Sequence, residues 1–562
     1  MRRIFLVTVL LTGVIIMASW QQGETVKVRV NTQQELGSFD PAWAWFGYDE
    51  PNYTYMKDGK KLLSELSELS PTPVFIRAHN LLTTGDGTAA LKWGSTNAYT
   101  EDTDGNPVYD WTIVDKIFDT WIERGIKPLV EISFMPEALS TKPDPYRHYW
   151  KPGDPYGDVY TGWRYPPNDY DKWEELIYQW VLHSVERYGR EEVDSWYWEL
   201  WNEPDIAYWG GTFVEYCKLY DYTAHAVKRA LPTAQVGGPH VTSPSYPVPA
   251  RFLRDFLIHC ESGINHKTGE IGSPLDFIGF HAKGAPRFID GMVRMGIGPH
   301  MKAVERGFEI VAASEKFRNL PIIIGECDPE GCAACGMDVA PQNGYRNGTM
   351  YPSYTASSFA RIYDMARHYN VNLIGIVSWA FEFEDQPWFH GFRDLATNGV
   401  GKPILNLFRM YGLMGGTRVD ATVEGGFNFR HIIDSGVRGP KSDIGVLATT
   451  EGDDAMVMLW NYHDDYKAAP DATTEITVTG LKGRRVIVEQ YLLDRNNNNS
   501  YEVWKEMGSP QNPTPEQYAT LEKTGKLHPS GKEVKMRVKN GTLVLKTTLQ
   551  RQSVSLVSIK PI

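Results

Sequence analysis

Short apolar segments alternate with amphipathic segments between about residue 60 and residue 415. The apolar segments are predicted strands, at residues 73–77, 127–134, 196–201, 234–238, 275–280, 320–325 and 373–379. The segments between them are predicted helices, at residues 111–124, 171–188, 213–231, 250–260, 302–313 and 354–368. Strands that are almost wholly apolar indicate a buried parallel sheet, and about eight strand–helix units close a barrel. The pattern therefore predicts an α/β fold whose larger part is a (β/α)8 TIM barrel.

The pattern changes after about residue 416. Residues 444–448, 455–460, 475–479 and 543–548 alternate or are β-branched, with turn residues between them, which predicts an antiparallel β-sandwich. Residues 26–30 alternate in the same way, so we expect an N-terminal strand to join the sandwich. The predicted organisation is a signal peptide at 1–19, this strand region at 20–45, the barrel at 46–415 and the sandwich at 416–562.

The first residues have the three-part form of a secretory signal. Arg2 and Arg3 precede an apolar run over residues 4–18, and Gln21 and Gln22 follow it. The run is shorter than a helix that spans a bilayer comfortably, and no cysteine lies at its end to carry a lipid anchor. We therefore expect a secreted or periplasmic protein without a membrane anchor.

Composition narrows the choice of partner. The 562 residues are 42% hydrophobic and 22% charged, which suits a large folded unit with an accessory one. The net charge of −12 argues against a nucleic-acid partner, which would require a basic face. Aromatic residues make up 12% of the chain, more than cores usually need, and flat apolar rings suit the C–H faces of sugars. The oligomeric state is not indicated.

The five cysteines are too few for a secreted disulfide scaffold. Cys327, Cys332 and Cys335 have spacing that could hold a metal, but a local fourth ligand is missing. Cys217 and Cys260 lie far away in helix-like segments. A local disulfide or free thiols in a loop is the better interpretation, so we predict neither a metal nor another cofactor.

Polar residues that could carry chemistry lie at the ends of the predicted strands. They are Arg77, His79, Glu203, His281, Lys283 and Glu326, with Trp379 at the end of the last strand. In a (β/α)8 barrel these positions converge on the C-terminal face, where active sites lie. We expect them to form one pocket, with His79, His281, Lys283 and Trp379 binding substrate.

Two glutamates form a candidate catalytic pair. Glu203 ends an aromatic strand beside the amide of Asn202, in surroundings that can keep a carboxyl group protonated near neutral pH. Glu326 closes the seventh strand and could face Glu203 across the barrel mouth. Retaining glycosidases place such a pair about 5 Å apart, one as nucleophile and one as acid/base. The alternatives are a merely solvated Glu203 and a Glu326 that only caps the following helix.

This pairing predicts a role for each residue. Glu326 would attack the anomeric carbon, while Glu203 would protonate the departing oxygen and later activate water. Arg77 would keep Glu326 ionised by charge and hydrogen bonding. Asn202 would contact the sugar 2-hydroxyl group, whose hydrogen bonds strengthen in the transition state.

Several motifs, in order along the chain, resemble glycoside hydrolase family 39. They are residues 77–82 (Arg-Ala-His-Asn-Leu-Leu), 130–137 (Val-Glu-Ile-Ser-Phe-Met-Pro-Glu), 201–204 (Trp-Asn-Glu-Pro), 236–239 (Val-Gly-Gly-Pro) and 504–510 (Trp-Lys-Glu-Met-Gly-Ser-Pro). That family contains β-xylosidases and α-L-iduronidases, on a barrel with an attached β-sandwich. The resemblance covers essentially the whole mature chain and implies that Glu203 is the acid/base and Glu326 the nucleophile.

The motifs that bear on the substrate point in two directions. Residues 281–285 (His-Ala-Lys-Gly-Ala) and 326–329 (Glu-Cys-Asp-Pro) resemble the iduronidase branch, where the lysine engages the substrate carboxylate. Residues 134–140 (Phe-Met-Pro-Glu-Ala-Leu-Ser) are nearer to the xylosidase type. Because a lysine point charge pairs well with a uronate, Lys283 favours an iduronidase-like uronic-acid substrate. A β-D-xylosidase is the alternative, and Lys283 would then be a solvated loop residue.

Two further segments bear on the mode of action. Arg393 is a possible second ligand for a substrate carboxylate. The insertion at residues 142–167, rich in Tyr, Trp and Pro, resembles a wall that closes the pocket, which favours release of terminal sugars. A non-catalytic carbohydrate-binding protein is the distant alternative, although such a protein would be expected to have lost one of the two glutamates.

Overall fold

The computed structural model of the protein describes residues 25–562, so the predicted signal peptide lies outside the described residues. The larger part is a closed barrel with strand order β12-β13-β2-β3-β6-β7-β8-β9. Neighbouring strands of the barrel pair in parallel, and a helix follows each strand along the chain. The prediction of an α/β TIM barrel is confirmed.

The elements of the barrel have the following bounds. The strands are β2 (Trp45–Tyr48), β3 (Phe75–Ala78), β6 (Lys127–Ile132), β7 (Tyr197–Leu200), β8 (Gln235–Val241), β9 (Phe277–Lys283), β12 (Pro321–Asp328) and β13 (Asn372–Ser378). The helices that follow them are α1 (Lys57–Ser67), α2 (Thr112–Ile122), α3 (Tyr170–Tyr188), α5 (Phe213–Ala230), α6 (Pro247–Ser262), α7 (Ile297–Ala312), α8 (Met350–Tyr369) and α9 (Pro403–Gly412). Only β2 was not predicted from the sequence pattern, although β3 and β7 are equally short.

Local sequence signals set the beginnings of several helices. The Asp169 carboxylate accepts hydrogen bonds from the first backbone N–H groups of α3. Thr212 and Glu215 form a capping box at the start of α5, in which each side chain bonds the other residue's backbone N–H. Such a cap contributes about 1 kcal/mol to helix stability. The helices that orient β7 and β8 are therefore fixed partly by their own sequences.

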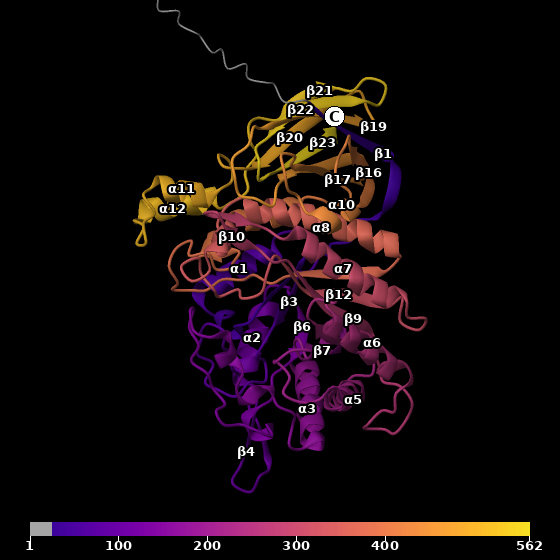
Figure 1. Ribbon diagram of the computed structural model, residues 1–562, viewed down its shortest axis with the longest axis vertical. Coiled ribbons are helices and arrows are strands. Elements are labelled where there is room, and N and C mark those ends of the chain that lie inside the picture. Colours follow the sequence, from indigo (N-terminus) through magenta and orange to yellow (C-terminus); the bar gives the residue numbers. More distant parts are fainter. Residues whose placement is uncertain (1–24) are drawn as a thin grey trace, which may run out of the picture.

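The second part is a nine-stranded, mostly antiparallel sheet that fits the predicted β-sandwich. Its order is β21 (Val534–Arg537), β20 (Arg485–Leu493), β23 (Ser553–Pro561), β18 (Asp454–Tyr462), β17 (Asp443–Glu451), β16 (Thr417–Val423), β1 (Val26–Ser38), β19 (Ala472–Thr479) and β22 (Leu543–Leu549). The N-terminal strand β1 pairs antiparallel with β16 and parallel with β19. In Figure 1, the indigo β1 accordingly lies among the orange and yellow C-terminal strands.

Helix α8 joins the two parts and lies between the barrel and the sheet in Figure 1. Most of its residues are buried, because the sheet covers the face that an isolated barrel would expose to water. Arg361 of α8 donates a hydrogen bond of 2.6 Å to Asp443 of β17. Ser357 and Trp460 also donate to Asp443, so this buried carboxylate is fully engaged.

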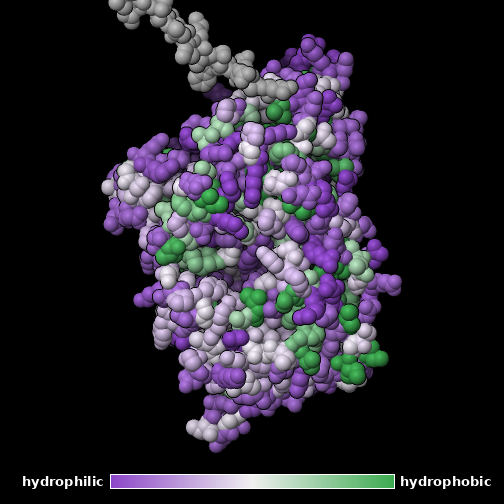
Figure 2. Space-filling view, in the orientation of Figure 1, coloured by the Kyte–Doolittle hydropathy of each residue, from purple (hydrophilic) through white to green (hydrophobic). Residues whose placement is uncertain are grey.

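One face of the molecule is drawn in Figure 2. Figure 2 shows a mainly hydrophilic face, on which hydrophobic residues lie singly or in small groups. Among residues 25–562, no helix is both long and apolar enough to cross a bilayer.

Candidate active site

The predicted strand-end residues gather around one cavity of about 330 Å³ at the C-terminal ends of the barrel strands. His79, Asn202, Glu203, Lys283, Glu326 and Trp379 line it. Arg77 and His281 do not line the cavity, but both contact Glu326 from fully buried positions. The structure therefore brings together every site residue that the sequence singled out.

The two candidate carboxyl groups face each other across His281. Its Nδ1 atom lies 3.0 Å from Glu203 Oε1 and 3.7 Å from Glu326 Oε1. One carboxyl oxygen of each glutamate and a ring nitrogen of His281 all lie within 4.8 Å of one another. These three groups could also ligate a metal ion. The two carboxyl groups, of Glu203 and Glu326, lie close enough to act on a single atom between them.

Three cations surround Glu326. Arg77 Nη1 and His79 Nε2 each lie 3.5 Å from Oε1, and the Lys283 ammonium group contacts Oε2. Burial alone would raise the pKa of Glu326, but Lys283, His281 and His79 outweigh it and hold the pKa well below its ordinary value. Glu326 is therefore an anion near neutral pH.

Glu203 has the opposite character. Burial, reinforced by the charge of Glu326, raises the pKa of Glu203 to about 7. Its backbone is also unusual, because φ is 45°, in the left-handed region. Near neutral pH a large fraction of Glu203 keeps its proton while Glu326 is charged. Two carboxyl groups with such different pKa values can serve as acid and as nucleophile.

A layer of buried charges beneath the cavity was not predicted from the sequence. Arg77 lies between Glu131 and Glu199, with Nη2 2.7 Å from Glu131 Oε2 and Nε in contact with Glu199. Although burial opposes it, Glu131 raises the pKa of His79 to about 9 through a contact of 2.6 Å. The available signal was an acidic residue inside each of two apolar strands, since such a residue must find a partner.

Asp49 and Lys92 were also missed. Asp49 directly follows β2, the strand that the pattern did not reveal, and Lys92 comes from the long loop after β3. The Lys92 ammonium group contacts Asp49 Oδ2, and Trp379 Nε1 donates a hydrogen bond of 3.0 Å to Asp49 Oδ1. His79 Nε2 lies 3.2 Å from the same oxygen. These contacts fix one wall of the cavity.

Asn202 and Arg393 both lie at the cavity but are already engaged. Asn202 Oδ1 accepts a hydrogen bond of 3.2 Å from Arg77 Nη2, which orients the amide. Arg393 donates through Nε to the Trp379 carbonyl at 2.7 Å and through Nη1 to Glu330 Oε1 at 3.0 Å. The guanidinium group of Arg393 thus stabilises the surrounding loops.

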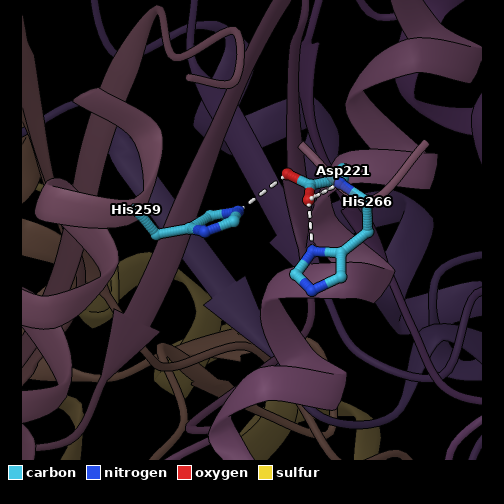
Figure 3. Close-up of side chains that lie close together, drawn as sticks. All are labelled: Asp221, His259 and His266. Carbon is cyan, nitrogen blue, oxygen red and sulfur yellow. Dashed lines mark hydrogen bonds and ion pairs between the residues drawn. The ribbon is translucent and has the colours of Figure 1, made fainter. Parts of the chain in front are cut away.

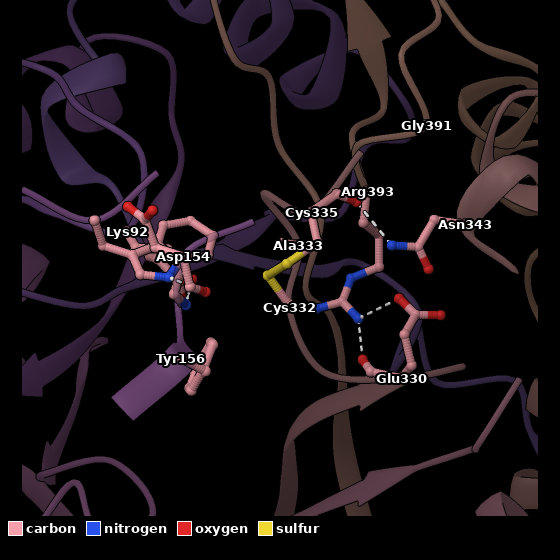
Figure 4. The surroundings of a disulfide bond; sticks show 12 residues. Lys92, Asp154, Tyr156, Glu330, Cys332, Ala333, Cys335, Asn343, Gly391 and Arg393 are labelled. Carbon is pink, nitrogen blue, oxygen red and sulfur yellow. Dashed lines mark hydrogen bonds and ion pairs between the residues drawn. A yellow bond between two sulfur atoms is a disulfide. The ribbon is translucent and has the colours of Figure 1, made fainter. Parts of the chain in front are cut away.

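A disulfide-closed loop forms part of the opposite wall (Figure 4). Cys332 and Cys335 are bonded to each other, whereas Cys327 is a buried free thiol. Arg346 donates to the carbonyl groups of Cys332 and Cys335, at 2.9 and 3.1 Å. Figure 4 shows the sulfur atoms on the side of the loop that faces Lys92 and Tyr156. Tyr156 belongs to the inserted segment 142–167 and lines the cavity.

A second group that could hold a metal ion lies away from the cavity (Figure 3). The buried Asp221 of α5 lies 2.9 Å from His259 Nε2 and 2.8 Å from His266 Nδ1. The backbone N–H of His266 and the hydroxyl group of Ser273 also donate to it. Both carboxylate oxygens are thus engaged, and we interpret the cluster as an anchor for the chain after α6.

Comparisons with known proteins agree with this geometry. The sequence profile of the family described as "Glycosyl hydrolases family 39" matches residues 26–540. A β-xylosidase of Geobacillus stearothermophilus is 27% identical over 508 residues, which cover 87% of this chain and 86% of the relative. An α-L-iduronidase of Mus musculus is 23% identical and covers 74% of this chain and 63% of its own.

The fold is shared with solved structures. A monomeric β-xylosidase from Caulobacter crescentus CB15 has a TM-score of 0.72 at 23% identity, over 95% of this chain and 99% of its own. A bacterial orthologue of human α-L-iduronidase has a TM-score of 0.74 at 19% identity, over 96% of this chain and 84% of its own. With the family match over nearly the whole described chain, the protein belongs to glycosyl hydrolases family 39 and is a glycoside hydrolase.

Proposed function

We propose that the protein is a retaining glycosidase, in which Glu326 is the nucleophile and Glu203 the acid/base. The observation that carries this proposal is the close approach of the two carboxyl groups, in which one oxygen of Glu203 lies within 4.8 Å of one oxygen of Glu326. Retaining enzymes separate the two groups by about 5 Å, whereas inverting enzymes leave about 6.5–9.5 Å for a water molecule. The ionised state of Glu326 and the raised pKa of Glu203 suit these roles.

The reaction proceeds in two displacements. Glu326 attacks the anomeric carbon while Glu203 gives its proton to the departing oxygen, which leaves a glycosyl ester on Glu326. Glu203, now an anion, takes a proton from water, and the resulting nucleophile displaces Glu326 from the sugar. Activity should therefore fall below the low pKa of Glu326 and above the pKa of Glu203 near 7.

Glu203→Gln tests the acid/base role. General acid catalysis contributes about 10²–10⁴-fold, so the variant should lose that much on glycosides with poor leaving groups. On aryl glycosides whose leaving groups need no proton, kcat/KM, which reports the first displacement, should fall far less, although kcat should still fall because the second displacement lacks its base. Equal losses on both kinds of substrate would contradict the assignment.

For the terminal sugar we propose a β-D-xyloside. Two β-xylosidases, 27% and 26% identical, match along most of both chains, whereas the mouse α-L-iduronidase is less similar and covers less. The Lys283 ammonium group also contacts Glu326, so the cation on which the uronic-acid prediction depended already has a partner. Both observations favour a β-D-xyloside over the uronic-acid substrate that the sequence motifs favoured.

A uronic-acid glycoside is the second candidate, because Lys283 and Arg393 line the same cavity. β-D-Xylose and α-L-iduronate share ring stereochemistry from C1 to C4, so one pocket can suit either sugar if its contacts at C5 differ. A panel of aryl β-D-xyloside, α-L-iduronide, β-D-glucuronide and α-L-arabinoside decides between them. We expect the xyloside to have the highest kcat/KM. A faster uronide whose cleavage is selectively lost in Lys283→Ala would overturn the choice.

We further propose exo action and export from the cytoplasm. The disulfide loop and Tyr156 of the inserted segment confine the cavity, which suits the end of a chain better than its middle. Release of single sugars from an oligosaccharide, with no internal cuts, would support exo action. The signal-like residues 1–19 support export. Recovery of the protein outside the cytoplasm, with an N-terminal sequence that begins near residue 20, would support this proposal.

A further inference from the structure

His240 connects the strands that carry the two candidate catalytic glutamates. It lies in β8, where the pairing with β9 shifts register between Pro239 and Val241, so His240 is the extra residue of a β-bulge. Its φ of 48° is in the left-handed region, which costs about 1–3 kcal/mol for a non-glycine residue unless its surroundings enforce it. The backbone carbonyl of His240 accepts the N–H of Glu203 at 3.0 Å.

The imidazole ring of His240 is fully buried and occupies space that two glycines leave free. A Cβ atom on Gly279 of β9 would overlap the ring at Nε2, and a Cβ atom on Gly325 of β12 would overlap it at Nδ1. Gly325 immediately precedes Glu326, at a second register shift, between β12 and β9. The ring therefore packs directly against the backbone that presents the nucleophile.

The same ring also reaches Glu326 through charged side chains. His240 Nε2 contacts Glu199 Oε2, and the other oxygen of Glu199 contacts Arg77 Nε. Arg77 Nη1 in turn lies 3.5 Å from Glu326 Oε1. Arg77 is shared among Glu131, Glu199 and Glu326, so the partner of Glu199 influences how strongly Arg77 attracts Glu326.

We propose that His240 is a positioning residue for both catalytic carboxyl groups. Its carbonyl group holds the backbone of Glu203, and its ring, on Gly279 and Gly325, holds the strand of Glu326. By engaging Glu199, the ring also leaves Arg77 available to Glu326. The inference rests on the proposed two-glutamate mechanism and adds the element that sets the geometry between the glutamates.

The test compares His240→Ala, His240→Gln and His240→Asn on an aryl β-D-xyloside, or on whichever aryl glycoside the wild-type enzyme cleaves best. Since a displacement of about 1 Å can cost 10²-fold, kcat of His240→Ala should fall about 10–100-fold with little change in KM. The acid limb of kcat/KM should move to higher pH, because Glu199 would then draw Arg77 away from Glu326. The longer Gln keeps a polar amide within reach of Glu199, whereas the shorter Asn does not, so Gln should recover activity and Asn should not.

His259→Gln, the same exchange at a partly buried histidine of α6 that also contacts a carboxylate, is the matched control and should leave kcat and the pH profile unchanged. If His240→Ala does not fold, the kcat of His240→Gln relative to that of His240→Asn tests the inference instead. Wild-type kcat and pH profile in His240→Ala, or a loss of kcat without movement of the acid limb, would overturn the inference. Failure of the proposed function is seen separately, as wild-type inactivity on every glycoside or full activity of Glu326→Gln.

Discussion

Replacing Lys283 by methionine removes one of the three cations around Glu326 and keeps a side chain of similar length. The Lys283 ammonium group contacts Glu326 Oε2, and its side chain is 19% exposed. Two unit charges about 4 Å apart interact by about 4 kcal/mol at an effective dielectric constant near 20. At about 1.36 kcal/mol per pKa unit, this corresponds to about 3 units as an upper limit.

The sign of the change follows from the roles of the two glutamates. Glu326 must be ionised to attack, so a higher pKa of Glu326 moves the acid limb of kcat/KM to higher pH. Arg77 and His79 remain in place, and we expect a movement of about 1–3 units. Lys283 also lowers the pKa of Glu203, so the alkaline limb should move above 7 in the same direction.

The assay is kcat/KM on an aryl β-D-xyloside across both limbs at constant ionic strength. Lys283→Arg keeps the charge and is the control, whose acid limb should stay near the wild-type position. If folded Lys283→Met has the wild-type acid limb, Lys283 does not set the ionisation of Glu326 and the electrostatic argument is refuted.

Three further results are expected. Glu326→Gln should lower kcat by about 10⁴-fold or more, as loss of the nucleophile does in other hydrolases, and retained turnover of aryl glycosides would exclude the assignment. The double variant Cys332→Ser/Cys335→Ser should lose about 2 kcal/mol of local stability, because it lacks the disulfide, and thermal melting measures this loss. Its KM should rise, because Cys332 lines the cavity, and initial rates measure this change. Arg361→Met should cost about 3–5 kcal/mol by leaving Asp443 without its cation, and denaturant unfolding that matches wild type would contradict this.

The sequence pattern predicted most of the barrel because its strands are buried on both faces. Strands such as β9 and β12 therefore begin with continuous apolar residues, which remain recognisable without knowledge of their neighbours, and turn polar only at their C-terminal ends. Strand β2 is equally buried but was not recognised, and Asp49, which directly follows it, was missed with it. The strand-end rule placed Glu203 and Glu326 in one site, because all parallel strands of a barrel end on the same face.

What only the tertiary structure decided is which group each charge meets. The sequence presented Lys283 as a ligand for a substrate carboxylate, but the fold brings it to Glu326. The sequence likewise could not reveal that Glu131 and Glu199 share Arg77, or that His240 lies against Gly325. Pairing and pKa depend on burial and on distances of a few ångströms between residues far apart in the chain. The hydrophobic pattern along the chain determines the barrel and its reactive face, whereas packing across the barrel decides the charges and positions of the groups that act there.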